Sequence, residues 1–174
     1  MNPSLRWRAA RLLAIGCLAL AACTLAPPAP VAYADSTLPP GVEPLQRFPM
    51  TIVRIQSAAG VHEFRAWVAD TPARRAQGLM FVKRLDADRA MFFPMGPPQV
   101  VSFWMKNTYI SLDLLFVDAD GRVVNVAANA TPLSLEPITA AAPVVAVLEV
   151  AAGTATRLRI RPGDQLLLLP PGQR

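Results

Sequence analysis

The chain has few residues of the kinds that most often bind metals or carry out catalysis. It holds two cysteines and one histidine in 174 residues. Both cysteines, Cys17 and Cys23, lie in or at the edge of an apolar N-terminal run, so no thiol remains elsewhere for a disulfide, a zinc site or cysteine catalysis. His62 has no second histidine or cysteine as a partner. We therefore expect no metal site and no cofactor.

Motifs of common enzyme classes are also missing. The sequence has no G-x-S-x-G motif, no glycine-rich phosphate loop and no pair of metal-binding carboxylates. Serine-hydrolase, nucleotide and metal-dependent chemistry are therefore disfavoured. Asp118-Ala119-Asp120-Gly121 begins like a calcium loop, but the later oxygen ligands are absent. A plain hairpin turn is the better interpretation.

Positive charge is weak once the N-terminus is set aside. The formal net charge is +5, but three arginines stand before the apolar N-terminal run. Without residues 1–22, 14 of the 17 basic residues remain against 12 acidic ones. A small and dispersed excess does not favour a nucleic-acid partner, which needs a clustered basic face.

The N-terminus has the pattern of a cleavable export signal. Three arginines precede an apolar run over residues 12–22, which is shorter than the roughly 20 residues that span a bilayer. Leu20-Ala21-Ala22-Cys23 resembles a lipobox, which predicts a signal peptide over residues 1–22 and a membrane anchor through lipidation of Cys23. Cleavage after Ala34 is the alternative. We expect an exported, periplasmic protein, membrane-anchored in the first case and soluble periplasmic or secreted in the second.

Residues 23–49 are rich in proline and poor in large apolar side chains. Seven prolines lie between residues 27 and 49. Such a segment cannot offset its ordering entropy by burial. We expect an extended, solvated tether that holds the following domain away from a membrane.

Residues 50–170 change to short apolar runs separated by turns. We expect a hairpin of Thr51–Gln56 and Val61–Ala69, then a helix of two or three turns that begins at Asp70-Thr71-Pro72. Further elements are expected at Ala90–Met95, Val100–Met105, Leu112–Val117, Arg122–Ala128, Val144–Val150, a short helix Thr154–Leu158, and Gln165–Leu169. The pattern predicts an all-β or β-dominated domain, a small sandwich or distorted barrel with one or two short helices.

Alternation of residues on both sides of Lys106 predicts a polar surface. If Val100–Met105 pairs antiparallel with Leu112–Val117, with Met105 opposite Leu112, one face of the pair is fully apolar. The opposite face and the loop that follows then carry the candidate ligand-binding residues: Ser102, Trp104, Lys106, Asn107 and Asp113. In this register Lys106 and Asp113 are near neighbours.

Short motifs follow one another along the domain. They are Arg75-Ala76-Gln77-Gly78-Leu79-Met80, Met91-Phe92-Phe93, Phe103-Trp104-Met105-Lys106-Asn107-Thr108, Leu112-Asp113, Asp118-Ala119-Asp120-Gly121-Arg122, Leu148-Glu149-Val150, Gly153 and Gly163-Asp164. Over residues 60–168 the chain resembles the family called domain of unknown function 192. The resemblance implies a compact β-rich fold, often behind an export signal, and no established activity. The chain departs from the family at Val82, Ala90 and Ser111, where arginine, glycine and proline are usual, and the first departure weakens any anion site built on that arginine.

Three functions remain open. The one we favour is a non-enzymatic envelope module that binds a small ligand or partner on the Trp104, Lys106 and Asp113 face. The second is a hydrolase or transferase that acts on an envelope polymer, with Asp113 as acid or base and Asp118 or Glu149 as a second carboxylate. The third is a structural or assembly module with no ligand. A purely structural role would make Lys106 and Asp113 an ion pair, with Trp104 packed over the lysine stem.

A group of cationic side chains lies in and after the predicted helix. It comprises Arg74, Arg75, Lys83, Arg84 and Arg89, set against Asp86 and Asp88. These cations could form a rim for lipid phosphate or an anionic glycan. A solvated helix surface is the simpler interpretation.

Overall fold

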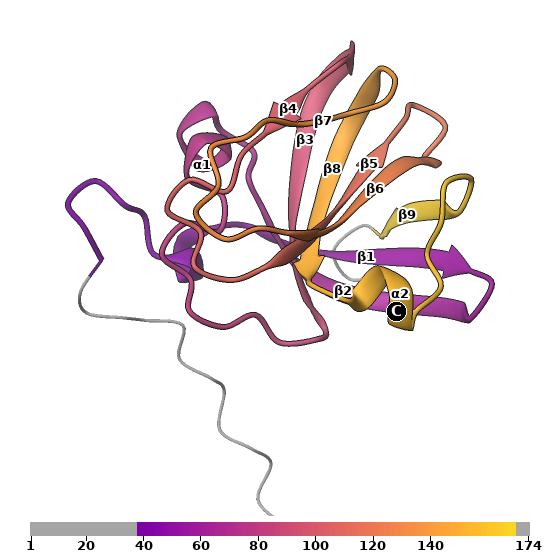
Figure 1. The fold of residues 1–174 in the computed structure, drawn as a ribbon, viewed down its shortest axis with the longest axis horizontal. Helices are drawn as coiled ribbons and strands as arrows, with labels where there is room; N and C mark the ends of the chain where they lie inside the picture. Colours follow the sequence, from indigo (N-terminus) through magenta and orange to yellow (C-terminus); the bar gives the residue numbers. More distant parts are fainter. Residues whose placement is uncertain (1–37, 170–174) are drawn as a thin grey trace, which may run out of the picture. The chain divides into compact units, whose positions relative to one another are not determined.

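The computed structural model describes residues 38–169, so the predicted signal peptide, Cys23 and both cleavage sites lie outside the described residues. The described part consists mainly of strands (Figure 1). Its elements are η1 Leu45–Arg47, β1 Met50–Ser57, β2 Gly60–Val68, α1 Pro72–Gln77, β3 Arg89–Gln99, β4 Ser102–Phe103, β5 Leu112–Val117, β6 Val123–Ala130, β7 Ile138–Thr139, β8 Val144–Ala151, α2 Thr154–Arg157 and β9 Gln165–Leu169. None of the described helices is long and apolar enough to cross a membrane.

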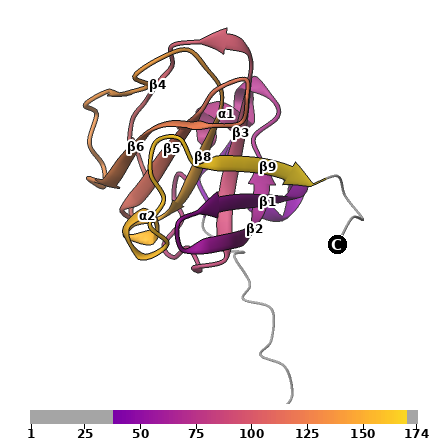
Figure 2. The same cartoon turned by 90° about the vertical axis from the view of Figure 1, so that its right-hand side faces the viewer.

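Seven strands form one sheet in the order β6-β5-β8-β3-β2-β1-β9, and β4 pairs with β7 in a separate two-stranded sheet. The large sheet curls until its two ends approach each other (Figure 2). An antiparallel bridge joins Arg122 to Gln165, and the Leu166 N–H donates to the Gly121 carbonyl at 2.7 Å. Gly121 has φ of 76°, and a Cβ there would lie 2.8 Å from the Leu166 carbonyl oxygen, so this approach requires glycine. The β-dominated fold predicted from the sequence, with a distorted barrel as one of its forms, is confirmed.

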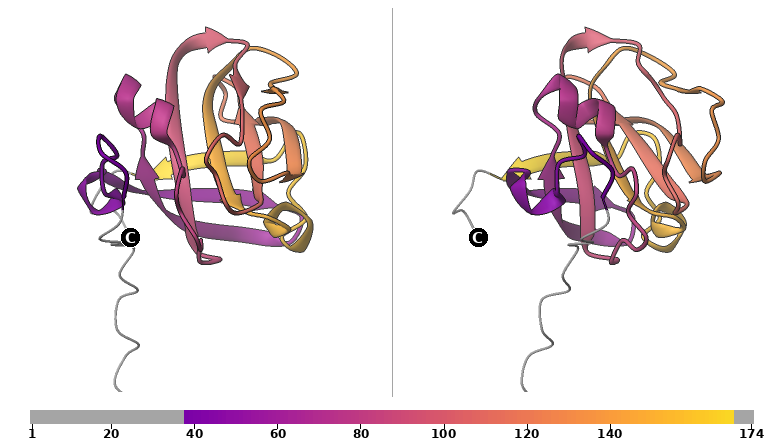
Figure 3. Two further views of the ribbon diagram at one scale, coloured as in Figure 1. Left: turned by 60° about the vertical axis from the view of Figure 1, so that its left-hand side comes forward. Right: turned by 90° about the vertical axis from the view of Figure 1, so that its left-hand side faces the viewer.

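The sheet has an apolar core on each face. The concave core contains residues from strands at both ends of the sheet, which meet inside the curl. Its members include Val53, Ile55, Phe64, Phe92, Leu115, Val123, Leu148 and Leu166. The convex core lies under α1, η1 and the long loops, and includes Trp67, Leu79, Met91, Phe93, Met105, Leu114, Phe116 and Val147. Figure 3 shows α1 beside the upper part of β3 on this outer side. The convex face therefore has room for a pocket between the sheet and its covering loops.

Several predicted elements are confirmed close to their expected bounds. β1 and β2 form the predicted hairpin, and β9 has the expected bounds. The predicted helix begins after Thr71, whose side chain accepts a hydrogen bond from the Arg74 N–H at 3.2 Å. Asp118 organises a plain hairpin turn, since its Oδ1 accepts from the backbone N–H groups of Asp120 and Arg122.

The predicted pairing of Val100–Met105 with Leu112–Val117 is wrong. β3 continues past Met95, where the predicted strand ends, as far as Gln99. β4 is only two residues long and pairs with β7. β5 instead lies between β6 and β8. The alternation itself is confirmed, because residues 101, 103 and 105 turn inward while 102, 104 and 106 are exposed. An alternating pattern fixes which side chains share a face, but not which strand lies alongside.

The end of the predicted tether is folded. Leu45 and Phe48 are buried, with 7% and 3% of their surface exposed, and both belong to the convex core. A solvated tether up to residue 49 is therefore wrong for residues 43–49. Burial of these two large apolar side chains favours an ordered stretch in spite of its prolines.

Candidate functional site

A pocket of about 440 Å³ opens on the convex side of the sheet. Its walls come from the end of α1 and the turn after it, from β4 and the turn that follows, and from residues 135 and 137, while β3 and β8 supply the floor. It is lined by Arg75, Ala76, Gln77, Gly78, Leu79, Met80, Phe93, Met95, Ser102, Phe103, Trp104, Lys106, Thr108, Leu135, Pro137 and Glu149. Segments far apart in the sequence thus meet around one cavity.

Glu149 is the buried acid of this pocket. It lies on β8 between Met91 of β3 and Leu114 of β5, both fully buried, and only 5% of its own surface is exposed. Its Oε2 atom has no hydrogen-bond partner among the described residues. Burial among apolar neighbours raises the pKa of Glu149 to about 8, so the carboxyl is neutral at pH 7.

Two cations and an indole lie at the mouth of the pocket. Lys106 is exposed and its Nζ lies 5.3 Å from the centroid of the Trp104 ring, a cation–π arrangement. Arg75 is half-buried, and its Nη1 donates to the carbonyls of Asp70 at 3.0 Å and Pro94 at 3.5 Å. Neither cation forms an ion pair with a described residue. Trp104 is 52% exposed, so the indole and the Lys106 ammonium are both accessible to a ligand.

The inner walls are aromatic and apolar. Phe103 meets Phe93 edge to face with 5.0 Å between the ring centroids, and meets Phe116 in the same way at 6.2 Å. Gly78, with φ of 51°, brings the chain after α1 so near that a Cβ there would lie 3.3 Å from the Phe93 ring. Along the run Phe103 to Lys106, side chains that pack in the core (Phe103 and Met105) therefore alternate with the exposed indole of Trp104 and ammonium of Lys106.

Asp113 does not belong to this pocket, and the predicted Trp104, Lys106 and Asp113 surface is wrong. Asp113 is fully buried, and three backbone N–H groups donate to its carboxylate: Asn129 at 2.8 Å and Gly153 at 3.2 Å to Oδ1, and Ala155 at 2.8 Å to Oδ2. It therefore holds the bulged end of β6 and the start of α2 to β5. A Lys106–Asp113 ion pair is excluded by the same contacts.

Asp113 and Glu149 also face opposite ways. Asp113 is paired with Val150 of the concave core, whereas Glu149 is paired with Leu114 of the convex core. Directly opposed residues of an antiparallel pair share a face, so the two carboxyl groups lie on different sides of the sheet. Asp113 and Glu149 therefore cannot act together on one bond as the polymer-hydrolase hypothesis requires.

The other predicted residues divide between the pocket and its surroundings. Ser102, like Trp104 and Lys106, lines the pocket, and its hydroxyl forms a 2.8 Å hydrogen bond with Thr139 Oγ1. Asn107 does not line it. Asn107 has φ of 55° in a turn, and its carbonyl accepts from the Phe81 N–H at 2.8 Å. A ligand-binding role for Ser102, Trp104 and Lys106 stays a prediction.

Sequence reasoning missed Arg75, Gln77 and the position of Glu149 in this site. Glu149 did carry a signal, because it is the one charge in the apolar run Val144–Val150. Two cations of the possible rim are paired with acids: Arg74 with Glu43 and Asp70, and Arg84 with Asp86. His62 is half-buried, and its Nε2 lies 3.2 Å from Ser57 Oγ.

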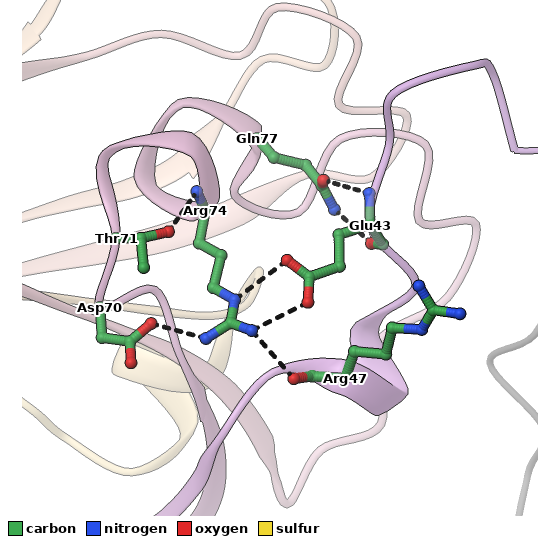
Figure 4. A network of polar contacts seen from close by, with 6 residues as sticks. All are labelled: Glu43, Arg47, Asp70, Thr71, Arg74 and Gln77. Atoms are coloured by element: carbon green, nitrogen blue, oxygen red, sulfur yellow. Dashed lines mark hydrogen bonds and ion pairs between the residues drawn. The ribbon is translucent and has the colours of Figure 1, made fainter.

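The pocket wall at α1 is held by the segment that precedes β1. Figure 4 shows Arg74 between Glu43, Asp70 and the Arg47 carbonyl, with both Glu43 carboxylate oxygens within 3.0 Å of the guanidinium. The hydrogen bond from Arg74 lowers the pKa of both Glu43 and Asp70. Gln77, which lines the pocket, exchanges two 2.8 Å hydrogen bonds with the Glu43 backbone. This network fixes α1 against residues 43–47.

Comparisons with known proteins agree with this fold. The family model DUF192, described as "Uncharacterized ACR", matches residues 53–168. A crystal structure of a protein of unknown function from Novosphingobium aromaticivorans DSM 12444 is 43% identical, with a TM-score of 0.70 over 75% of this chain and 94% of that one. A provisionally named transcription regulator from Sinorhizobium meliloti 1021 is 39% identical, with a TM-score of 0.67 over 70% of this chain and 95% of that one. No curated protein matches the chain.

Proposed function

This chain belongs to the domain of unknown function 192 family, and we propose that it is an envelope module that binds a small ligand in the pocket above Glu149 without converting it. The observation that carries the proposal is the unpartnered Oε2 atom of Glu149 beneath an accessible cavity. A buried polar atom without a hydrogen bond costs about 1–3 kcal/mol. A ligand that completes this bond would recover that free energy.

The pocket also has the composition of a small-molecule site. Its 440 Å³ falls within the roughly 300–1,000 Å³ of typical ligand pockets, which combine apolar walls with a few polar groups. Glu149 is the one acid among the described residues that line it. Hydrolysis of a glycosidic bond requires two carboxyl groups, which favours binding over catalysis here.

Occupancy of the pocket should be visible in thermal stability. We expect compounds from a library of envelope sugars, short peptides and organic acids to raise the Tm of the purified protein by several degrees at saturation. Met95→Trp places a bulky ring on half-buried Met95 of the lining and should abolish that rise. Val61→Trp is the matched control, because Val61 is exposed on β2 and does not line the pocket. A supporting compound raises the Tm of the unmodified protein and of Val61→Trp but not that of Met95→Trp. If the library contains no such compound, the ligand-binding function is wrong.

The envelope location rests on the N-terminal sequence, in which Cys23 follows a lipobox-like triplet. Cells that are fed radioactive palmitate should label the chain. Cys23→Ser should remove the label, and Cys17→Ser, a matched substitution inside the apolar run, should keep it. Persistent labelling of Cys23→Ser, or a mature N-terminus at Asp35, would show that the chain is not anchored at Cys23.

A further inference from the structure

The charges of the pocket show which class of ligand it accepts. At pH 7 its lining holds the cations of Arg75 and Lys106, while its one acid, Glu149, is neutral. Neither cation is paired with an acid among the described residues. The electrostatic potential at the mouth is therefore positive. An anionic group is attracted there and a cationic one is repelled.

The free hydrogen-bonding capacity of the interior is small. Ser102 is already bonded to Thr139, and the Gln77 amide is bonded at both ends to the Glu43 backbone. Thr108 Oγ1 donates to the Lys106 carbonyl at 3.3 Å, which leaves Glu149 Oε2 as the buried side-chain atom without a partner among the described residues of the lining. A neutral sugar would bring several hydroxyl groups that find no partner there, and unpaired polar groups oppose binding. The interior therefore suits a ligand with a single polar group at its inner end.

The space between mouth and floor is apolar. Phe93, Met95 and Phe103 line the depth of the pocket, and Trp104 and Leu135 line its outer part. Trp104 and Leu135 are among the exposed large apolar side chains of the described residues. Bringing a hydrocarbon body into contact with these surfaces is favourable at about 25 cal/mol per Å² of apolar area buried.

We infer, building on the proposed function, that the ligand is a small amphiphilic organic acid. Its carboxylate or other anionic group binds Arg75 and Lys106 at the mouth, its apolar body packs against Phe93, Met95 and Trp104, and a hydroxyl or carbonyl at its inner end forms a hydrogen bond with the Glu149 carboxyl. The three parts of the ligand correspond to three zones of the pocket in order of depth.

Four probes that share an eight-carbon chain separate these contributions: ω-hydroxyoctanoate, octanoate, octanediol and ω-aminooctanoate. Titration calorimetry at pH 6.5 should show that ω-hydroxyoctanoate binds about tenfold more tightly than octanediol, which lacks the anion, and also more tightly than octanoate, which lacks the inner hydroxyl.

Variants assign the binding to the named residues. Arg75→Gln and Lys106→Gln should each lower the affinity for ω-hydroxyoctanoate about tenfold and leave the affinity for octanediol unchanged. Arg157→Gln, which removes an exposed cation on α2 outside the lining, is the matched control and should change neither. Equal affinity for octanediol and ω-hydroxyoctanoate would overturn the anionic class. Tightest binding of ω-aminooctanoate would overturn it in favour of a zwitterion that pairs with ionised Glu149.

The two proposals fail differently. If none of the four probes binds but the compound library yields a ligand that Met95→Trp excludes, the amphiphilic acid is wrong and the binding function stands. If neither the probes nor the library yield such a ligand, both are wrong.

Discussion

Asp113→Ala is expected to reduce the free energy of unfolding by about 3 kcal/mol or more, since each buried donor that is left unpaired costs about 1–3 kcal/mol. The substitution strands three backbone N–H donors, those of Asn129, Gly153 and Ala155. These donors come from the end of β6 and the first turn of α2, so the loss acts on two connections at once. Urea denaturation monitored by circular dichroism measures the effect.

Asp118→Ala is the matched control for this prediction. Asp118 also accepts two backbone N–H bonds, but in a turn at the surface, so its loss should cost about 1 kcal/mol. Asp113→Asn should fall between the two, because its amide nitrogen cannot accept a backbone hydrogen bond. A near-normal stability of Asp113→Ala together with lost ligand binding would show that Asp113 acts on a ligand after all.

Glu149→Gln is expected to change how stability depends on pH. The pKa of Glu149 is about 8 in the folded protein and near 4.5 in an ordinary glutamate. Between these pH values the folded protein keeps a proton that the unfolded chain has lost, so the free energy of unfolding falls by up to about 1.4 kcal/mol per pH unit. This contribution is fully present below pH 4.5 and is lost as the pH rises to about 8. The glutamine variant has no such loss.

The measurement is the difference in unfolding free energy between Glu149→Gln and the unmodified protein from pH 5 to pH 8. It should grow by roughly 3 kcal/mol in favour of the variant. Glu136→Gln, at an exposed acid outside the pocket lining, should run parallel to the unmodified protein. Parallel curves for Glu149→Gln as well would mean that Glu149 is ionised in the folded protein and that the floor of the pocket is charged.

Local patterns were sufficient to predict most strands and the family. The hairpin of β1 and β2 and the last strand follow from apolar runs that end at turn residues. The resemblance to domain of unknown function 192 is confirmed by the family match over residues 53–168. These features depend on residues close together in the sequence.

The errors concern partners that are distant in the sequence. The pairing of β5 with β8 rather than with β4 depends on the path of the whole chain. Asp113 looked like half of an ion pair because a carboxylate in an apolar strand needs a partner. Its partners are backbone N–H groups 16 to 42 residues further along the chain. Almost every residue has a backbone N–H, so the residue types do not show which of them donate to Asp113.

For Glu149, the local sequence predicts the face of the strand but not the pocket. A lone acid inside an apolar strand indicates a functional or structurally satisfied group. Its alternation with Leu148 and Val150 places it on the face opposite to theirs. That this face holds a pocket depends on α1 and the turn after β4, which pack there only in the folded molecule.

The pairing of β9 with β1 also determines when folding can finish. β9 pairs with β1, with Leu169 opposite Ile52, so strands from the two ends of the domain must meet. The chain is made from its amino end, and one side of β1 stays unpaired until β9 pairs with it. Contacts so far apart in sequence form slowly, and an open strand edge can recruit a second chain. Until β9 pairs, the edge of β1 is therefore open to such pairing.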